Sequence, residues 1–298
     1  MPPMRVVFLG ALNMDQIVPV AHLPRAGETV TGGDLLRAPG GKGSNQAVAA
    51  ARLGASVTMV GRVGRDSFGR ELTRALREVG VSTNRVRACD RPTGTALIFV
   101  DDRGENAIAV SPGANEQLLP ADIPRRAVES SDVVVATLEA PLSSIEEAFR
   151  LARLSYVRTV LNAAPAQLVP RSLLELCDVV ICNETELASL AGSSEATASD
   201  ANTARSLRTF AEQIVVVTLG ERGALAIVGD RVLEQRAFNV HVVDAVGAGD
   251  AFVAGFVVGR RFVSESGVET ALRWGCAAGS LATTRHGAQP SMPDLGEV

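Results

Sequence analysis

Residues 244–256 read Asp244-Ala245-Val246-Gly247-Ala248-Gly249-Asp250, followed by Ala251-Phe252-Val253-Ala254-Gly255-Phe256. Small residues that lead into an apolar helical run let backbone amides converge at a helix N-terminus, where the helix dipole favours an anion. A carboxylate in the first turn can accept a proton from a hydroxyl group beside that point. The stretch therefore predicts an anion hole at Gly247, Ala248, Gly249 and Asp250, with Asp250 as general base. A glycine-rich turn capped by an aspartate is the alternative interpretation.

Outward from this stretch, short apolar runs alternate with helical patterns through most of the chain. Strand-like runs occur at 4–10, 57–60, 133–136, 157–161, 179–182, 214–218 and 224–228. Helical patterns occur at 44–53, 67–80, 142–154, 184–191 and 199–211, and the Ser/Ala/Thr-rich stretch 192–204 is either a surface loop or a weak helix. Near-continuous apolar strands between amphipathic helices are typical of a parallel sheet that is covered on both faces. The sequence therefore predicts an α/β core.

Two segments, at about 12–35 and 93–111, show strand-like alternation instead of buried runs. In the second, strands at 95–100 and 106–110 flank the polar turn 101–105. We predict a small antiparallel sheet attached to a single domain that spans residues 1–298. Leu97, Phe99, Ile108 and Val110 are expected to give this sheet an apolar face that must be buried, either on its own core or against a second subunit.

Composition excludes several classes of function. The 298 residues include 46% hydrophobic residues, carry a formal net charge of −4 and contain no block of like charge. Nucleic acid and membrane surfaces are therefore not expected partners. No apolar run approaches the length of a membrane-spanning helix. The four cysteines form no CxxC pair and do not cluster with the three histidines, so we expect reduced thiols and a cytoplasmic protein.

The common nucleotide-binding motifs are also missing. Gly41-Lys42 is followed by Gly43 and not by Ser or Thr, and no G-x-G-x-x-G follows the first strand. These departures disfavour a P-loop NTPase and a dinucleotide-dependent dehydrogenase. Lys42 is the only lysine in the chain, in a position where a compact point charge can approach a ligand that a guanidinium cannot.

Several motifs together resemble one family. The 244–250 stretch resembles the D-T-x-G-A-G-D signature of the ribokinase-like carbohydrate kinases, and Gly40-Gly41-Lys42-Gly43-Ser44-Asn45-Gln46-Ala47 resembles their G-G-K-G-x-N-x-A signature. Further matches to the family lie at 162–166 (N-P-A-P), 183–186 (N-x-x-E), 218–223 (T-L-G-x-x-G) and 285–291 (G-A-Q-x-S). The resemblance covers essentially the whole chain. It implies a Rossmann-like, three-layer α/β/α core with a β lid that closes over a sugar.

The resemblance also implies an activity and a set of site residues. The expected reaction is ATP-dependent phosphorylation of D-ribose at O5, with Mg²⁺ and an activating K⁺, in a homodimer that pairs through the lid. Sugar-binding residues would be Asn13, Met14, Asp15, Gly41, Lys42, Gly43, Ser44, Asn45, Glu139 and Asp250. The nucleotide and Mg²⁺ would lie against Asn183, Glu186, Thr218, Leu219, Gly220, Glu221, Arg222, Gly223, Gly249 and Cys276. The K⁺ site would use Asp244, Val246, Ala282, Arg285, Gly287 and Ser291.

Three positions depart from the family pattern. Ala245 stands where the signature has Thr, Ala163 replaces the first Pro of N-P-A-P, and Cys276 falls near a position where an Asn often contacts adenine. Other interpretations remain open. The substrate could instead be deoxyribose or a nucleoside such as adenosine, with Met14 shaping the pocket, or the chain could be a non-catalytic regulator that binds sugar or nucleotide. Retention of Asp250 and of the glycines at 247 and 249 argues against the regulator.

Overall fold

A sheet of nine strands forms the centre of the computed structural model, which describes residues 2–192, 201–259 and 265–298. The strand order is β13-β12-β11-β10-β9-β8-β1-β4-β5. Its strands are β1 (Arg5–Leu9), β4 (Ser56–Gly64), β5 (Ser82–Cys89), β8 (Val133–Thr137), β9 (Arg158–Asn162), β10 (Val179–Asn183), β11 (Ile214–Thr218), β12 (Ala224–Val228) and β13 (Arg231–Gln235). Neighbours from β5 to β11 pair in parallel, whereas β12 and β13 add an antiparallel edge.

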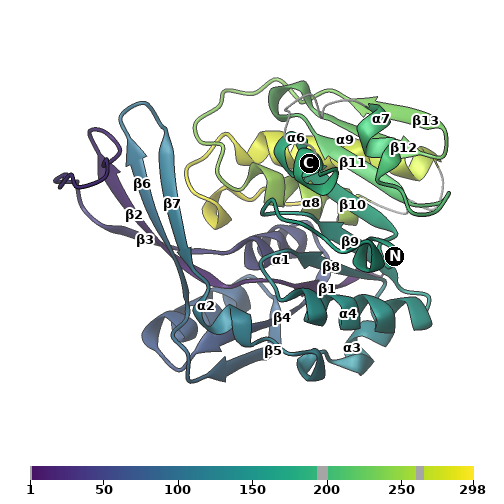
Figure 1. Cartoon of the computed structure of the whole chain (residues 1–298), viewed down its shortest axis with the longest axis horizontal. Helices are drawn as coiled ribbons and strands as arrows, with labels where there is room; N and C mark the ends of the chain where they lie inside the picture. The colour runs from purple at the N-terminus through teal and green to yellow at the C-terminus, as the bar shows by residue number, and fades with distance from the viewer. Residues whose placement is uncertain (1, 193–200, 260–264) are drawn as a thin grey trace.

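Successive side chains of the central strands enter two separate hydrophobic cores, as the two-residue period of a strand requires. In β1, Val6 and Phe8 belong to one core, and Val7 and Leu9 to the other. The first core packs against helices α1 (Lys42–Arg52), α2 (Ser67–Glu78), α8 (Ala248–Val258) and α9 (Glu265–Ala282). The second packs against α3 (Arg125–Glu129), α4 (Leu142–Leu154), α5 (Arg171–Leu174), α6 (Glu184–Leu190) and α7 (Ala201–Ser206). The three-layer α/β/α architecture is confirmed (Figure 1).

The sequence analysis missed some elements of this core. Strands β5 and β13 lie at the two edges of the sheet and have mostly polar, partly exposed residues. Helices α3, α5 and α9 were not predicted either. Of the predicted helix 199–211, residues 201–206 form α7; residues 193–200, which include most of the Ser/Ala/Thr-rich stretch, lie outside the described part of the chain.

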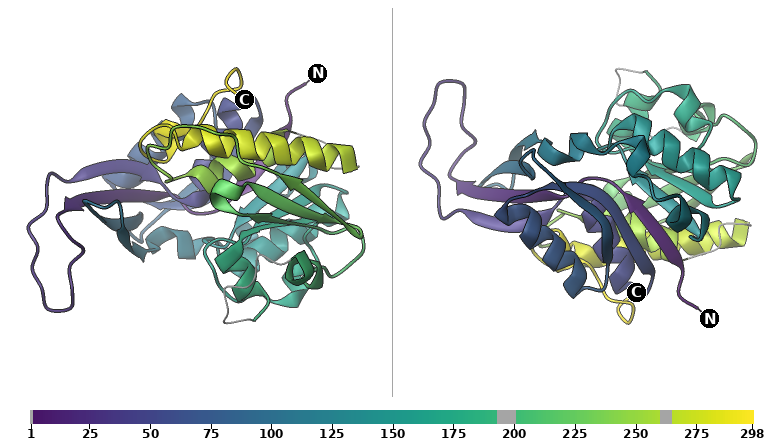
Figure 2. Two further views of the ribbon diagram at one scale, coloured as in Figure 1. Left: turned by 90° about the horizontal axis from the view of Figure 1, so that it is seen from above. Right: turned by 90° about the horizontal axis from the view of Figure 1, so that it is seen from below.

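The second sheet projects from the α/β body and will be called the lid (Figures 1 and 2). Its strands are β2 (Asn13–Val20), β3 (Leu36–Gly40), β6 (Gly94–Asp101) and β7 (Asn106–Ser111), in the order β3-β2-β6-β7. Both outer pairings are antiparallel, but the central pair, β2 with β6, is parallel. The strand β3 begins just beyond the predicted lid segment 12–35.

The register of the lid corrects one expectation. Ile98 pairs with Ile108, and Leu97 pairs with Ala109. Because residues directly opposite each other share a face, Ile108 and Val110 lie on one face of the lid, while Leu97 and Phe99 lie on the other. The four side chains therefore do not form the single apolar face that was predicted.

Within the described residues, no helix is long and apolar enough to cross a membrane.

Candidate active site

The N-terminus of α8 opens at the carboxyl edge of the main sheet. Gly247 caps it in the left-handed conformation, with φ 81°, which glycine adopts without steric cost. The next residues turn into the helix, and Asp250 in its first turn is only 8% exposed. In the described part of the chain, the amides of Gly249 and Asp250 donate to no acceptor. Free amides and a helix dipole thus meet beside a buried carboxylate, as the sequence predicted.

Both oxygens of the Asp250 carboxylate are held by amide side chains from α1. Asn45 Nδ2 donates to Oδ2 at 3.0 Å, and Gln46 Nε2 donates to Oδ1 at 3.0 Å. Gln46 Nε2 also donates to Asn162 Oδ1 at the end of β9, at 2.9 Å. Burial raises the pKa of Asp250, while Lys42, Gln46 and Asn45 act in the opposite direction. The carboxylate is therefore fixed in orientation and is a stronger proton acceptor than an exposed aspartate.

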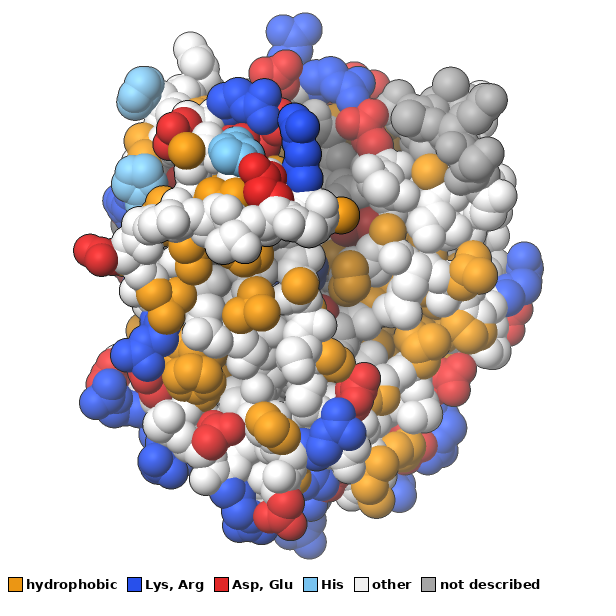
Figure 3. Space-filling view, turned by 60° about the vertical axis from the view of Figure 1, so that its left-hand side comes forward, with side chains coloured by type: hydrophobic (Ala, Val, Ile, Leu, Met, Phe, Trp, Pro, Cys, Tyr) orange, Lys and Arg blue, Asp and Glu red, His pale blue; other side chains and the backbone are white. Residues whose placement is uncertain are grey.

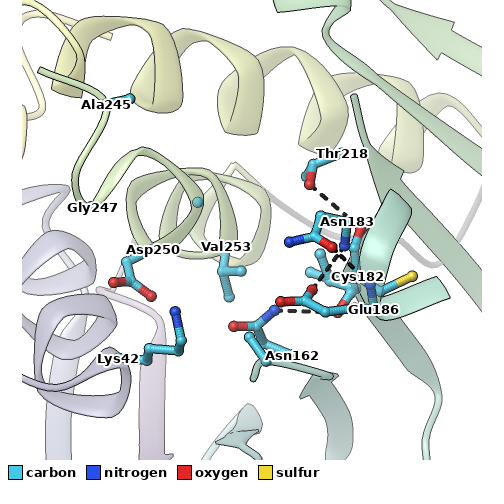
Figure 4. A pocket seen from close by; sticks show the side chains of 13 residues that line it. Lys42, Asn162, Cys182, Asn183, Glu186, Thr218, Ala245, Gly247, Asp250 and Val253 are labelled. Atoms are coloured by element: carbon cyan, nitrogen blue, oxygen red, sulfur yellow. Dashed lines mark hydrogen bonds between the residues drawn. The ribbon is translucent and has the colours of Figure 1, made fainter. Parts of the chain in front are cut away.

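Lys42 begins α1 on the opposite side of the same space, and its amine points toward Asp250 (Figure 4). Burial alone would lower the pKa of Lys42, but the nearby carboxylates of Asp250, Glu139, Glu186 and Asp15 together raise it above its ordinary value. The ammonium group is therefore charged at neutral pH, where it can attract phosphate oxygens.

Between Lys42, Asp250 and the ends of β9, β10 and β11 lies a cleft of about 250 Å³. Its walls include Asn162, Asn183, Glu186, Thr218, Gly247 and Gly249 (Figure 4). Asn183 and Glu186 form a capping box at the start of α6, with Glu186 N donating to Asn183 Oδ1 and Asn183 N donating to Glu186 Oε2, each at 2.8 Å. Burial raises the pKa of Glu186. One oxygen of Glu186 stays available to the cleft.

Asn13 and Asp15 lie on the same face of β2, as alternation along a strand requires. Gly40 on the paired strand leaves room for Asp15, since a Cβ there would stand 2.0 Å from Asp15 Oδ2. Burial and the Asp250 charge raise the pKa of Asp15 to about 7. Met14 points to the other face of the strand and is fully buried in the core. The structure therefore does not support a contact between the Met14 side chain and a sugar.

The start of α1 explains several glycines of the second motif. Gly41 has φ 90°, and a Cβ there would stand 2.7 Å from the Ala11 carbonyl oxygen. Gly43 packs against the backbone of Gly10, so its lack of a side chain serves packing. Ser44 Oγ donates to the Gly40 carbonyl oxygen at 2.6 Å and accepts from Gln289 Nε2 at 3.2 Å. The Ser44 hydroxyl and the close approach of Gly43 to Gly10 thus hold the start of α1 in place.

Glu139 lies in the loop after β8 and reaches the first turn of α1. Its Oε2 accepts the Lys42 backbone N–H at 2.7 Å, which satisfies a free amide of the helix N-terminus. Burial raises the pKa of Glu139 to about 7, with the Lys42 charge acting in the opposite direction. One oxygen of Glu139 thus holds α1 in place, and the other is left for a ligand.

The predicted nucleotide residues fall into two groups. Thr218 ends β11 at the cleft, and Leu219, Gly220, Glu221, Arg222 and Gly223 form the following turn, whose Arg222 pairs with Glu184 at 2.7 Å. Cys276, by contrast, lies in α9 with its side chain in the core; it is 4% exposed, and its Sγ donates to the Gln235 carbonyl oxygen at 3.7 Å. The structure therefore gives Cys276 almost no surface for a nucleotide, and its prediction as a contact is not supported.

The predicted cation residues gather around the loop before α8. Asp244 accepts Val246 N–H at 2.9 Å and Gly287 N–H at 2.8 Å, which joins this loop to the C-terminal segment. Four backbone carbonyl oxygens accept no hydrogen bond from the described residues: those of Val246, Ala282, Arg285 and Gly287. Ser291 Oγ donates to the Ala288 carbonyl oxygen at 2.8 Å. The Arg285 side chain pairs with Glu297 on the surface.

Comparison with known proteins assigns this arrangement to a family. Residues 4–295 match the pfkB family of carbohydrate kinases. The chain belongs to that family. This kinase is 36% identical over 297 residues to the ribokinase of Haemophilus influenzae, and the aligned region covers 98% of this chain and 96% of the relative. It is 34% identical over 297 residues to the deoxyribokinase of Salmonella typhi, with the same coverage.

Solved structures give the same assignment. The ribokinase of Arabidopsis thaliana, described as complexed with ribose and ATP, superposes on this kinase with a TM-score of 0.89 and 32% identity, covering 100% of this chain and 97% of the other. Ribokinase from Thermotoga maritima gives a TM-score of 0.88 and 29% identity, covering 99% and 97%. The phosphotransferase activity and the ribokinase-like fold that the sequence motifs implied are thus confirmed.

Two residues of this kinase site had no predicted role. Gln46 was quoted only as part of a motif, yet it joins Asp250 to Asn162. Asn162 lines the cleft and donates through Nδ2 to the Ile181 carbonyl oxygen at 3.2 Å. Asn162 has a signal in the sequence, because it is a polar residue at the carboxyl end of an apolar strand, where open α/β sheets bind their ligands. Gln46 has none beyond its motif.

Proposed function

We propose that this kinase transfers the γ-phosphoryl group of ATP to O5 of D-ribose, giving ribose 5-phosphate and ADP. The observation that carries the proposal is the placement of Asp250 at the free N-terminus of α8, opposite Lys42 and beneath the lid residues Asn13 and Asp15. A sugar between the lid and Asp250 would have its primary hydroxyl next to both a base and an anion hole. The ribokinase relatives and the fold they share support ribose as the sugar.

Asp250 would accept the hydroxyl proton as the oxygen attacks phosphorus in line. The amides of Gly249 and Asp250 and the ammonium group of Lys42 would stabilise the charge that develops on the transferring oxygens. Asn45 and Gln46 keep the carboxylate in position throughout. No covalent intermediate with the protein is required. Closure of the lid would exclude water, which otherwise competes with the sugar for the phosphoryl group.

Mg²⁺ would be held near Asn183 and Glu186, most of its ligands being phosphate oxygens and water. These residues fit the role because the capping box leaves one Glu186 oxygen facing the cleft. Within the described residues no group of three or more His, Cys, Asp and Glu side chains forms a dedicated metal cage. When bound with ATP, the ion supplies positive charge to the phosphate oxygens.

A monovalent cation, K⁺, would bind below the anion hole. The carbonyl oxygens of Val246, Ala282, Arg285 and Gly287, which accept no hydrogen bond within the described part of the chain, offer the oxygen ligands that such an ion requires. Asp244 adds charge close by and ties two of these segments together. Ser291 Oγ donates its hydrogen to the Ala288 carbonyl oxygen, which leaves the lone pairs of the hydroxyl oxygen for the ion. Occupancy of this site would stiffen the loop that presents the amides of α8.

The whole chain would act as one catalytic domain and would dimerise through its lid. Leu36, Ile108 and Val110 are each more than half exposed on the lid face that also carries Asp15. The side of the molecule from which the lid projects has mostly hydrophobic and uncharged side chains in the middle of the view and most of its charged side chains toward the outline (Figure 3). A second copy would cover this surface. The four free thiols agree with a cytoplasmic protein.

Deoxyribose is the second candidate substrate, because a deoxyribokinase is similar to this chain over nearly its full length. The two sugars differ by one hydroxyl, and a site built to pair that hydroxyl discriminates strongly against its loss. The same catalytic residues would serve both reactions.

A coupled assay of ADP release, with ATP, Mg²⁺ and K⁺, tests the proposal across ribose, deoxyribose, fructose and adenosine. We expect ribose to give the highest kcat/KM and Asp250→Asn to abolish turnover. Asp178→Asn is the matched control. Asp178 accepts Thr159 N–H at 2.9 Å just before β10, so it lies at the amino ends of the strands, whereas the cleft lies at their carboxyl ends. A higher kcat/KM for another acceptor would overturn the substrate, and absence of turnover with all of them would favour a non-catalytic regulator.

A further inference from the structure

Asn115 lies at the base of the lid, in the short helix η1 (Gly113–Gln117) that follows β7. It is 3% exposed, and its side chain makes three hydrogen bonds at the point where β2 begins. Its Oδ1 accepts Leu12 N–H at 3.0 Å, and its Nδ2 donates to the Leu12 carbonyl oxygen at 3.3 Å and to Asn13 Oδ1 at 2.8 Å. No sequence motif pointed to this residue.

These bonds fix the orientation of two amides. A backbone N–H can only donate and a backbone carbonyl can only accept, so Leu12 determines which end of the Asn115 amide is oxygen and which is nitrogen. The second hydrogen of Asn115 Nδ2 must then meet an acceptor, and the atom it meets is Oδ1 of Asn13. The backbone groups of Leu12 therefore orient the Asn115 amide, and the Asn115 amide in turn orients the Asn13 amide.

The consequence reaches the proposed sugar site. With Oδ1 of Asn13 turned toward Asn115, Nδ2 is the end of the amide that is directed elsewhere and can meet a ligand. That nitrogen donates to no acceptor in the described residues, and it is absent from the fully enclosed polar atoms that lack a partner. Asn13 shares its face of β2 with Asp15. The lid thus presents one committed donor, Asn13 Nδ2, beside one acceptor, the Asp15 carboxylate.

We propose that Asn115 is a positioning residue for sugar recognition: it commits Asn13 to donate a hydrogen bond to a hydroxyl oxygen of the substrate, while Asp15 accepts one. This inference rests on the proposed sugar-kinase function. A hydroxyl group both donates and accepts, so a donor and an acceptor on one strand match a polyol with two neighbouring hydroxyls. An amide that was free to rotate would lose part of this discrimination.

Gly94 supports the pairing from β6. A Cβ at Gly94 would stand 2.2 Å from Asn115 Nδ2 and 2.3 Å from Asn13 Oδ1. Its φ is not in the left-handed region, so backbone strain does not require glycine at this position. Glycine is required there because a side chain would occupy the space that the Asn115 and Asn13 amides fill. The contact between Asn115 and Asn13 is thus built into three separate segments of the chain.

The test begins with Asn115→Asp. The new carboxylate keeps the size of the side chain and still accepts Leu12 N–H, but it repels Asn13 Oδ1 and favours a reversed Asn13 amide. We expect the KM for ribose to rise about tenfold or more, because reversing the amide replaces a hydrogen bond by a repulsive contact, while kcat changes by less than about threefold. Asn115→Ala removes the donor without adding charge and is expected to raise KM by a smaller factor.

Gln213→Glu is the matched control. Gln213 is a fully buried amide whose Nε2 donates to the carbonyl oxygens of Leu174 and Cys177 and whose Oε1 accepts Thr209 N–H, far from the lid. Both Gln213→Glu and Asn115→Asp put a carboxylate in place of a buried amide, so both should lower the melting temperature. Gln213→Glu should nevertheless leave the KM for ribose unchanged. A similar rise of KM in this control would show that loss of stability, and not orientation of Asn13, explains the result.

A double-mutant cycle with Asn13→Ala decides whether Asn115 acts through Asn13. If it does, adding Asn115→Asp to Asn13→Ala changes the ribose KM by less than about twofold. If the two effects multiply independently, the proposal is wrong. Binding of ribose alone, followed by calorimetry, should show the same pattern. Failure of the wild type to phosphorylate or bind any sugar would instead remove the proposed function on which this inference rests.

Discussion

At the scale of single residues, Lys42 stands out because it is one ammonium group among four carboxylates, whose charges keep its pKa above the ordinary value despite burial. Lys42→Met should lower kcat by about 10²- to 10³-fold, since a cation beside the developing phosphoryl charge is lost. Lys42→Arg keeps the charge but brings a broader group, so partial activity is expected. Steady-state kinetics measures both. A kcat for Lys42→Met within about threefold of the wild type would show that the ammonium group does not stabilise the transferring phosphoryl group.

The raised pKa values of Asp15 and Glu139 lead us to expect that the free energy of unfolding falls as the pH rises toward neutrality. Burial is the main cause that raises the pKa of each to about 7, well above the value in the unfolded chain. A raised carboxyl pKa means that the folded state binds more protons, so its contribution to stability is present below about pH 4 and is lost as the pH rises toward 7. The free energy of unfolding should therefore fall by about 1 kcal/mol or more between about pH 5.5 and about pH 8.

Chemical denaturation at these two pH values measures this change. Asp15→Asn and Glu139→Gln should each make the profile flatter, because the substituted group no longer titrates. Carboxylates with a lowered pKa, such as Asp66 and Asp122, act only at more acidic pH and do not contribute in this window. A stability that rises over the same range would contradict the burial of these two carboxyl groups.

At the scale of elements, the start of α8 separates the roles of two glycines. A Cβ at Gly249 would meet no atom within 4 Å of it, although Gly249 lines the cleft. Gly249→Ala should therefore fold with equal or slightly higher stability, by up to about 1 kcal/mol, but lose at least about tenfold in kcat because the methyl group obstructs approach to the amides. Thermal unfolding and kinetics of the same sample give both numbers.

Gly247→Ala is the contrasting variant on the same turn. Gly247 has φ 81°, and a Cβ there would stand 3.0 Å from Ala288 Cα. The left-handed conformation costs an alanine about 1–2 kcal/mol, so this variant should be less stable and less active. If Gly249→Ala retained full kcat, the anion hole would have to lie elsewhere.

The elements that the sequence revealed are those whose burial is regular. Strands β8, β10 and β11 are almost wholly buried, and their apolar runs predicted them to within a residue or so. Strands β5 and β13 lie at the sheet edges, where one side is exposed and the pattern Ser-Thr-Asn-Arg or Arg-Val-Leu-Glu carries no clear period. The lid showed alternation, but alternation alone does not fix register, and so the faces of Leu97 and Ile108 were confused.

At the scale of the whole molecule, the proposed site residues that local motifs predicted are those carried by one segment, such as Asp250 and its glycines. Gln46 and Asn115 escaped notice because their roles are contacts across the fold: Gln46 meets Asp250 across 204 positions, and Asn115 meets Asn13 across 102. A buried amide has no sequence signature of its partner. Met14 was misplaced for a related reason, since a residue between two site residues on a strand faces the opposite side.

The proposed dimer gives a prediction that belongs to the assembly. The lid face with Asp15 carries Leu36, Ile98, Ile108 and Val110, whereas the opposite face includes the exposed Arg37 beside Gln16. The first face is therefore better suited to burial between two copies. Ile108 is 54% exposed, and Ile108→Glu should convert the dimer into monomers, because a charge would be buried at the interface without a partner.

Sedimentation velocity on the full chain measures the change of mass. Leu97→Glu is the matched control, since Leu97 is 46% exposed on the same hairpin but on the other face. It should leave the dimer intact, as should Leu154→Glu at the end of α4, far from the lid. The Ile108→Glu monomer should also show a raised KM for ribose, because the lid strands that hold Asn13 and Asp15 would lose their support. Dissociation by Leu97→Glu alone would place the interface on the opposite face of the lid.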